Sequence, residues 1–156
     1  MTAQPQSPAT FGTPFQQVLR LYHIVTPVFE QYVGVSLARW RLLTQLYRNG
    51  PLNQSELQQR VQVDPAAITR QVKQLEEAGL VERRPSPSDN RFTVVTLTPQ
   101  GQALAETAHQ RRDAFDDLIM HGLSAAEIAV FERCIAQIRE QAWFVAAQLE
   151  AERSDS

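Results

Sequence analysis

The stretch that decides the fold extends from Asn53 to Gly101 and reads NQSELQQRVQVDPAAITRQVKQLEEAGLVERRPSPSDNRFTVVTLTPQG. Asn53 followed by Glu56 predicts a capping box, which begins a short helix. Asp64 followed by Pro65 predicts a second helix start, because aspartate is a good N-cap and proline needs no N–H at the first helical position. The stretch therefore predicts two helices separated by a short turn.

The second helix is expected to end at Gly79, since glycine is typical of the residue after a helix. Beyond it, the segments LVERR (80–84) and RFTVVTLT (91–98) are β-rich, and the turn-rich PSPSDN (85–90) separates them, which predicts a hairpin. Helix, turn, helix and hairpin is the order of a winged helix-turn-helix, which reads duplex DNA. The predicted fold class is mainly α with a small β wing.

Further helices are predicted on the N-terminal side. Residues 1–13 are rich in Pro, Gln, Ser and Thr and predict a disordered tail. An apolar stripe follows in a first helix, which Pro27 is expected to kink or split. A second helix is predicted from Leu37 to Arg48, ended by Asn-Gly-Pro at 49–51. The stripe consists of Phe15, Val18, Tyr22, Val25, Phe29 and Tyr32.

Two more helices are predicted after the hairpin. Thr98 and Pro99 begin one that extends to about His121, and Ser124 with Glu127 forms a capping box for the last. This last helix has apolar residues at the a and d positions of three heptads, as in a helix packed along another helix. The positions are Ile128, Phe131, Ile135, Ile138, Ala142, Val145 and Leu149.

A heptad stripe fits either an intramolecular bundle or an interface with a second chain. We favour the second, because terminal helices flanking a compact winged helix have little core of their own to cover. Residues 14–34 and 102–150 are then the helical dimerisation region, and residues 35–101 the DNA-binding region. A twofold dimer presents two recognition helices roughly 34 Å apart and selects a palindrome. The dimerisation residues are predicted to be Phe15, Val18, Tyr22, Ile128, Phe131, Ile135, Ile138, Val145 and Leu149.

Composition and charge agree with this interpretation. The net charge is −2, but residues 39–91 sum to +3 and residues 92–156 to −5. The attraction of DNA phosphates to a protein depends on the electrostatic potential within about 10 Å, so a basic middle region is compatible with DNA binding. No apolar run is long enough for a membrane span, and the N-terminus lacks the plan of a signal peptide. A single cysteine fits the reducing cytosol, so we expect a cytoplasmic protein without a membrane partner.

Catalytic and metal motifs are not found in the sequence. It has no phosphate-cradling glycine loop, no nucleophile elbow and no paired Cys/His motif, so we predict no enzyme activity and no cofactor. His109 has Glu106 one turn earlier, but surface polar residues of this kind are far commoner than zinc ligands, and we predict no metal site. Cys134 is expected to be a buried structural thiol.

The residues resemble the MarR family, the bacterial multiple antibiotic resistance regulators. The resemblance rests on VDPAAITRQVKQLEEAGLVERR (63–84), SDNRFTVVTLTPQG (88–101) and GVSLARWRLLTQL (34–46), and it extends over about residues 14–150. It implies a homodimeric transcription factor with six helices and a wing. Such proteins are usually repressors and are often released from DNA by a small anionic or phenolic ligand.

The predicted DNA contacts lie on the helix that begins at Pro65 and in the wing. Arg70 is the best candidate for a base contact, because its guanidinium can pair bidentately with guanine. At the hairpin tip, Arg91 can enter the minor groove, with Asp89 orienting it. Arg83 and Arg84 are expected to meet phosphates. The recognition helix contributes Ala66, Ala67, Thr69, Arg70, Gln71 and Lys73.

A ligand pocket, as the resemblance implies, is expected between the terminal helices and the winged region. Aromatic side chains would form its apolar wall, and an arginine would hold a carboxylate or phenolate. The predicted lining residues are Tyr22, His23, Phe29, Arg39, Trp40 and Arg111. The alternative function is a winged-helix module that binds another protein without specific DNA binding. Salt dependence separates the two functions, because affinity for DNA falls steeply with salt.

Overall fold

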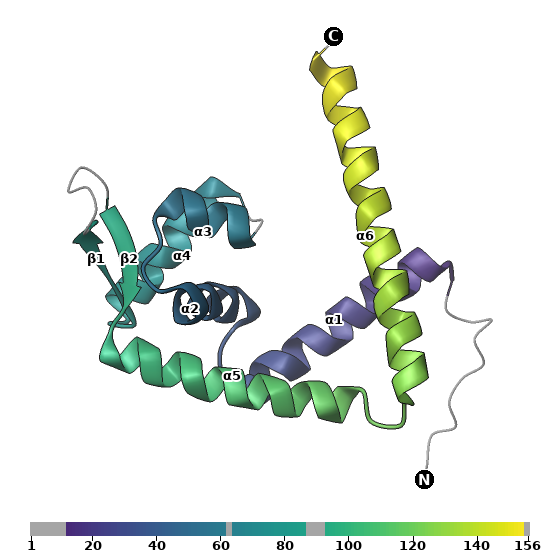
Figure 1. The fold of residues 1–156 in the computed structure, drawn as a ribbon, viewed down its shortest axis with the longest axis horizontal. Helices are drawn as coiled ribbons and strands as arrows, with labels where there is room; N and C mark the ends of the chain where they lie inside the picture. The colour runs from purple at the N-terminus through teal and green to yellow at the C-terminus, as the bar shows by residue number, and fades with distance from the viewer. Residues whose placement is uncertain (1–11, 62–63, 87–92, 155–156) are drawn as a thin grey trace. The chain divides into compact units, whose positions relative to one another are not determined.

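The computed structural model describes residues 12–61, 64–86 and 93–154. Within these ranges the chain forms six helices and one two-stranded sheet, with the hairpin between the fourth and fifth helices (Figure 1). The mainly helical fold with a small β element is therefore confirmed. Most of the predicted N-terminal tail, residues 1–11, lies outside the described residues. The chain divides into two compact units, Met1–Phe115 and Asp116–Ser156, and each is described by itself.

Helix α1 (Pro14–Val33) begins with a capping box that the sequence analysis did not identify. The Thr13 hydroxyl accepts from the Gln16 N–H (3.3 Å), and the Gln16 side chain accepts from the Thr13 N–H (2.9 Å). Pro27 lies inside the helix, so of the two outcomes predicted for it, a kink or a split, the split is wrong. Pro27 is exposed, and water can satisfy the carbonyl that its missing N–H leaves unpaired.

The next three helices begin where the sequence predicts. Asn53 accepts from the Glu56 N–H (2.9 Å), and the Glu56 carboxylate accepts from the Asn53 N–H (2.8 Å), which completes the predicted capping box. The Asp64 carboxylate accepts from the Ala67 N–H at 3.1 Å. These helices are α2 (Leu37–Asn49), α3 (Gln54–Val61) and α4 (Pro65–Glu77).

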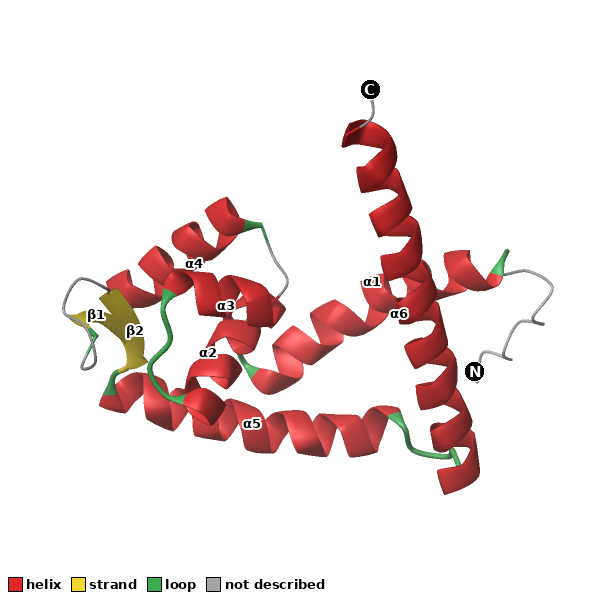
Figure 2. Ribbon diagram, turned by 45° about the horizontal axis from the view of Figure 1, so that its top comes forward, coloured by secondary structure: helices red, strands yellow, loops and turns green. Residues whose placement is uncertain are grey.

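The predicted hairpin is formed by β1 (Val81–Pro85) and β2 (Thr93–Leu97), shown in yellow in Figure 2. The strands are antiparallel, and Val81 lies opposite Leu97. Leu52, in the loop between α2 and α3, exchanges two backbone hydrogen bonds with Val95 (3.1 and 2.8 Å). This bridge fixes β2 to the helical part of the winged region.

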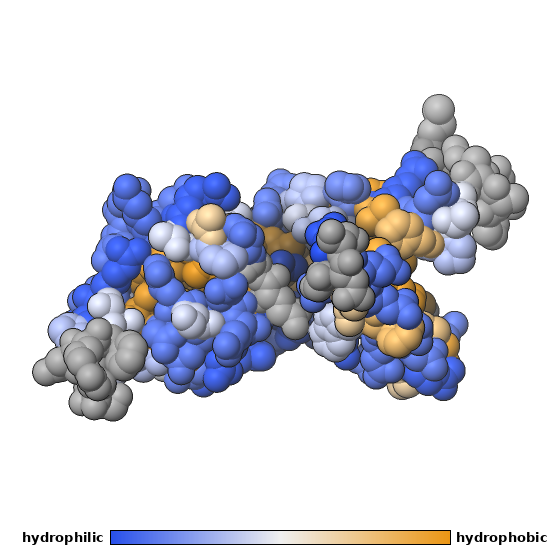
Figure 3. All heavy atoms as spheres, turned by 90° about the horizontal axis from the view of Figure 1, so that it is seen from above, coloured by the Kyte–Doolittle hydropathy of each residue, from blue (hydrophilic) through white to orange (hydrophobic). Residues whose placement is uncertain are grey.

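One hydrophobic core holds α2, α3, α4 and the hairpin together. Four leucines from the three helices, Leu42, Leu43, Leu57 and Leu75, are fully buried. Burying one leucine side chain stabilises a fold by roughly 2 kcal/mol, so these residues and their neighbours give the winged region a core of its own. On the face shown in Figure 3, the outside of this region is mostly hydrophilic.

Helix α5 (Pro99–Ile119) follows β2 without a loop. The Thr98 hydroxyl accepts from the Gly101 N–H (3.0 Å) and donates to the Gly79 carbonyl (2.6 Å). The Thr98 N–H donates to the Leu80 carbonyl (3.1 Å). A Cβ atom on Gly101 would overlap the Leu80 carbonyl, so only glycine lets α5 begin this close to the end of α4.

The second unit contains helix α6 (Ala125–Ser154). The predicted capping box is present: the Glu127 carboxylate accepts from the Ser124 N–H (2.8 Å) and hydroxyl (2.7 Å). These two hydrogen bonds, the backbone one first, lower the pKa of Glu127 below its ordinary value. None of the described side chains of α6 is buried. Among the described residues, no helix has the length and apolar character needed to cross a membrane.

Candidate nucleic-acid interface

One face of α4 anchors the helix in the core of the winged region. Ile68, Val72 and Leu75 are at most 1% exposed, so these three side chains are buried. Their spacing of four and three residues places them on a single side of the helix. The opposite side of α4 is therefore held outward by the packing of the core.

That outward side carries most of the predicted base-reading residues. Thr69, Arg70 and Lys73 follow Ala66 by three, four and seven residues, which places all four on one helix face, and all four are exposed. Ala67 and Gln71 are half-buried at its edge. This face combines two methyl groups, a hydroxyl and two cations, which are groups that contact thymine methyls, base edges and phosphates in the major groove.

Two of these side chains already have partners on α4. The Thr69 hydroxyl donates to the Pro65 carbonyl (3.1 Å), so its oxygen is left as an acceptor. The Lys73 ammonium lies 3.8 Å from the Glu77 carboxylate, and both side chains are more than 60% exposed. Such an exposed pair is worth little, so Lys73 can exchange Glu77 for a phosphate. Arg70 makes no ion pair with a described residue.

Helix α3 adds polar groups that the sequence analysis missed. Gln54, Ser55 and Gln58 line a shallow pocket of about 200 Å³ together with Pro65 and Thr69 of α4. Their position beside the start of α4 depends on packing between two helices. The sequence shows that the first turn of α3 is polar, but it does not show which of these polar side chains lie beside α4.

The wing arginines that the structure describes are held by carboxylates. The Arg83 guanidinium lies 3.1 Å from the Glu76 carboxylate of α4, and the Arg84 guanidinium 2.6 Å from Glu82 on the same strand. The first pair joins β1 to the recognition helix. Asp89 and Arg91, predicted at the wing tip, lie outside the described residues.

We expect a double-mutant cycle on Glu76 and Arg83 to give a coupling free energy of roughly 0.5–1 kcal/mol in urea unfolding. Both side chains are about one-third exposed, so solvent screens the pair only in part. The matched control is the same cycle on Lys73 and Glu77, a longer and more exposed pair whose coupling should be close to zero. Equal coupling in the two cycles would show that Glu76 does not hold Arg83.

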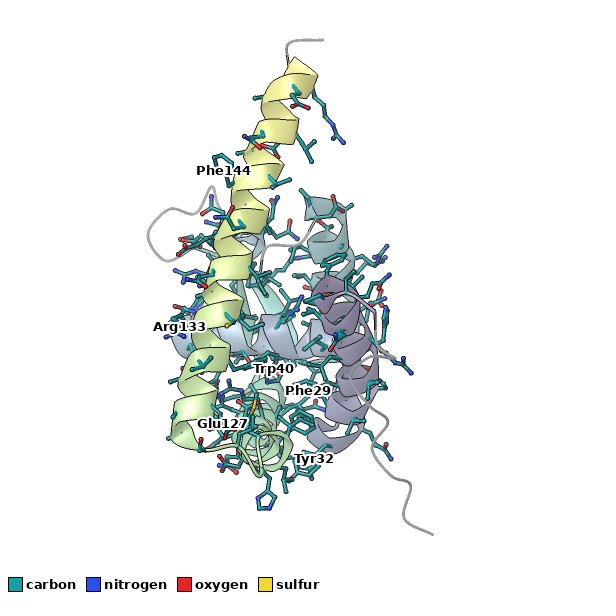
Figure 4. All side chains as sticks on the ribbon, turned by 90° about the vertical axis from the view of Figure 1, so that its right-hand side faces the viewer. Phe29, Tyr32, Trp40, Glu127, Arg133 and Phe144 are labelled. Carbon is teal, nitrogen blue, oxygen red and sulfur yellow. The ribbon has the colours of Figure 1, made fainter. Side chains whose placement is uncertain are left out.

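The predicted ligand residues are brought together only in part. Phe29 lies edge-to-face with Trp40 and with Phe115, with ring centroids 5.4 Å apart in each case, and Figure 4 shows Phe29 beside Trp40. Arg111 lines a pocket of about 550 Å³, and the Tyr32 ring, 5.7 Å from that of Phe115, lines it as well. The aromatic cluster and the arginine are therefore close neighbours.

The remaining predicted ligand residues lie elsewhere. Tyr22 and His23 contact each other on the exposed part of α1, and Arg39 is exposed on α2. Phe29, in the aromatic cluster beside this pocket, is 8% exposed and belongs to the core. The sequence analysis did not include Val28, Gln31 and Tyr32, which line the Arg111 pocket. Tyr32 was assigned only to the apolar stripe of α1, because helical spacing does not reveal which neighbouring helix a side chain meets.

His109 and Cys134 were the residues considered for a metal site and for a structural thiol. His109 lies 3.9 Å from Asp113, and its ring packs on Tyr47. No group of metal-binding side chains is found in the described parts of the chain. Cys134 is exposed, so the prediction of a buried thiol is wrong. The apolar stripe beside Cys134 suggested burial, but that stripe is itself exposed in the single chain.

These observations define a class of protein. Two helices joined by a short turn, with the outer face of the second held outward and followed at once by a β-hairpin, form a winged helix-turn-helix. Chains of this class are built to place one helix against the major groove of DNA.

Comparison with known proteins identifies the family. Residues 35–93 match the family model described as MarR family. The chain is 40% identical over 111 residues to the HTH-type transcriptional regulator YdgJ of Bacillus subtilis, covering 71% of this chain and 68% of that protein. It is 33% identical over 108 residues to the multiple antibiotic resistance protein MarR of Salmonella typhimurium, covering 68% and 74%. The chain therefore belongs to the MarR family of transcriptional regulators.

A solved structure agrees on the fold. BpsR of Bordetella bronchiseptica, whose DNA binding is regulated by 6-hydroxynicotinic acid, superimposes with a TM-score of 0.74 at 21% identity. The match covers 87% of this chain and 98% of that chain. YdgJ is named as a transcriptional regulator, and both YdgJ and the MarR relative come from bacteria.

Proposed function

We propose that this regulator is a homodimer that binds a palindromic or pseudo-palindromic operator and represses transcription from it. The observation that carries the proposal is the outer face of α4, where Thr69, Arg70 and Lys73 are exposed while the opposite face is buried. A helix fixed in this way loses little conformational freedom when it enters the major groove. Arg70 reads a guanine, and Lys73 meets a phosphate.

The wing extends the contact in this proposal. Residues 35–101 form the DNA-binding region, and Arg91, oriented by Asp89, enters the minor groove. Arg84 reaches a phosphate by leaving Glu82; the Arg84 side chain is 65% exposed, so solvent weakens this pair. Arg83 has a different role, because its ion pair with Glu76 supports the wing against the recognition helix.

Residues 14–34 and 102–150 form the dimerisation region. Exposed apolar side chains on α1 and α6 support this assignment, among them Phe15 (68% exposed) and Ile138 (52% exposed). Burying such a stripe against a second copy removes apolar surface from water, which is the main driving force of association. The two copies then engage the two half-sites of the operator together.

Release from DNA follows when a small aromatic or anionic ligand changes the separation of the two recognition helices. The pocket beside Tyr32 and Arg111 supports a site for it, since it offers an aromatic wall and a guanidinium. BpsR, which shares the fold, responds to an aromatic acid. A ligand that prefers one helix separation shifts the population toward it.

A mobility-shift titration tests the proposal. We expect the duplex upstream of the protein's own gene to be shifted at nanomolar protein, and a scrambled duplex to compete poorly. Arg70→Ala should weaken binding by about ten- to one-hundred-fold, the usual range for loss of a bidentate base contact. Arg133→Ala, which removes an exposed cation from α6, is the matched control and should leave binding unchanged. Equal affinity for the scrambled duplex would favour the protein-interaction module instead.

A further inference from the structure

A second pocket, separate from the one beside Arg111, lies between α2 and α3. It measures about 200 Å³ and is lined by three arginines, Arg41 and Arg48 of α2 and Arg60 of α3. Arg41 and Arg48 are seven residues apart, so they project from the same side of α2. All three arginines are exposed, so water screens part of their mutual repulsion, and an anion bound among them would relieve the rest.

Neighbouring carboxylates do not neutralise these arginines. None of the residues that line the pocket is acidic, and none of the three arginines makes an ion pair with a described residue. Glu56 lies one turn before Arg60, but its carboxylate already accepts a hydrogen bond from the Asn53 N–H. Arg60 donates instead to the neutral Asn49 side chain at 3.2 Å, a bond that an anion can replace.

The other residues that line the α2–α3 pocket are suited to a small organic group. Trp40 and Val61 are half-buried, and Thr44 is 9% exposed, so the pocket has an apolar wall with one hydroxyl. The Trp40 indole N–H is buried and has no hydrogen-bond partner among the described residues. An unsatisfied buried donor is costly, so a ligand oxygen that reached it would recover a hydrogen bond.

The pocket is separate from the residues proposed to read DNA. Gln54, Ser55 and Gln58 lie on the side of α3 that meets the start of α4, and none of them lines the α2–α3 pocket. At 3.6 residues per turn, Arg60 is roughly 200° further round the helix than Gln58. The Arg60 side chain is therefore poorly placed for the phosphates of a duplex whose major groove receives α4.

We infer that the α2–α3 pocket binds a small-molecule anion: a carboxylate or a phosphate ester attached to one flat, apolar group. The guanidinium groups pair with the acidic oxygens, and the body packs on Trp40 and Val61. The pocket is smaller than a drug-sized site, which limits the ligand to about one ring. This inference does not depend on DNA binding and is tested without DNA.

Trp40 provides the signal for the test. The chain has two tryptophans, so Trp143→Phe leaves Trp40 as the only indole. In this background we expect phenyl phosphate or benzoate to change the fluorescence saturably, whereas sodium chloride at equal ionic strength does not. Arg48→Gln and Arg60→Gln should each weaken binding roughly ten-fold, the effect of losing one charge-assisted hydrogen bond. Tighter binding of phenyl phosphate than of benzoate would identify a phosphate ester, and the reverse an aromatic acid.

Two further variants make the result specific. Arg133→Gln removes an exposed arginine of α6 and should leave the affinity unchanged. Loss of binding in Arg111→Gln, with normal binding in Arg48→Gln and Arg60→Gln, would assign the ligand to the pocket beside Tyr32 and overturn the inference. A response that does not saturate, or that sodium chloride reproduces, would also overturn it. Circular dichroism of each variant verifies that the fold is retained.

Discussion

Gly101→Ala is expected to destabilise the protein by about 3 kcal/mol, although the same change in an ordinary helix stabilises. The added Cβ would lie 2.8 Å from the Leu80 carbonyl carbon and closer still to its oxygen. Both are backbone atoms, so no side chain can rotate away. Relief requires α5 to move from Leu80, which breaks the Thr98 N–H bond to the Leu80 carbonyl.

Urea unfolding measures this effect, and Ala103→Gly is the matched control. Ala103 is exposed in the first part of α5, so its replacement reports helix propensity alone and should cost about 1 kcal/mol. A Gly101→Ala protein as stable as the wild type would contradict this prediction. It would mean that the junction between β2 and α5 shifts to make room for the Cβ atom without lowering the free energy of unfolding. A similar slope of unfolding free energy against urea would show that both variants unfold from the same compact state.

Structural features that depend on residues close together in the sequence could be predicted from the sequence. The caps formed by Asn53, Asp64, Thr98 and Ser124 each join groups three residues apart, and all four are present. Pro27 shows the limit of a local rule, because proline weakens a helix by one hydrogen bond and packing of the same helix elsewhere can outweigh that loss. Phe29 and Val33, buried on the following turns of α1, supply such packing.

Interactions between distant segments could not be predicted in the same way. The Glu76–Arg83 pair and the bridge between Leu52 and Val95 depend on how separate elements pack. The same holds for the aromatic side chain beside Arg111, where the pocket implied by the resemblance was assigned Tyr22 and the structure has Tyr32. The arginines of the α2–α3 pocket were counted as charge in the sequence, and only the packing of α3 on α2 places them around one hollow.

The stripe on α6 supports the proposed dimer on physical grounds. Helix α6 has 30 residues, and none of its described side chains is buried. Most of the stability of helices in proteins comes from packing of an apolar face rather than from helix propensity. Phe131, Ile135 and Leu149 are 41%, 39% and 52% exposed, and they are spaced as heptad positions. A second copy offers the same stripe, which is how a twofold interface forms.

Ile135→Asp is therefore expected to convert the dimer to a monomer and to lower operator affinity by two orders of magnitude or more. The aspartate places a charge in the centre of the apolar stripe, where its desolvation is not compensated. A monomer engages one half-site at a time and loses the gain of simultaneous binding, which amounts to roughly 10²–10⁴ in affinity. Analytical ultracentrifugation measures the first effect and a mobility shift the second.

Ala147→Asp is the control that separates the interface from charge in general. Ala147 is exposed on the same helix but lies roughly 120° round from Ile135. Both variants add one negative charge to α6, so electrostatic repulsion of DNA affects them alike. A dimeric Ala147→Asp protein that binds its operator, beside a monomeric Ile135→Asp protein that does not, would assign dimerisation to the stripe. Ile135→Asp that stayed dimeric would contradict that assignment, and any loss of DNA binding would then need another cause.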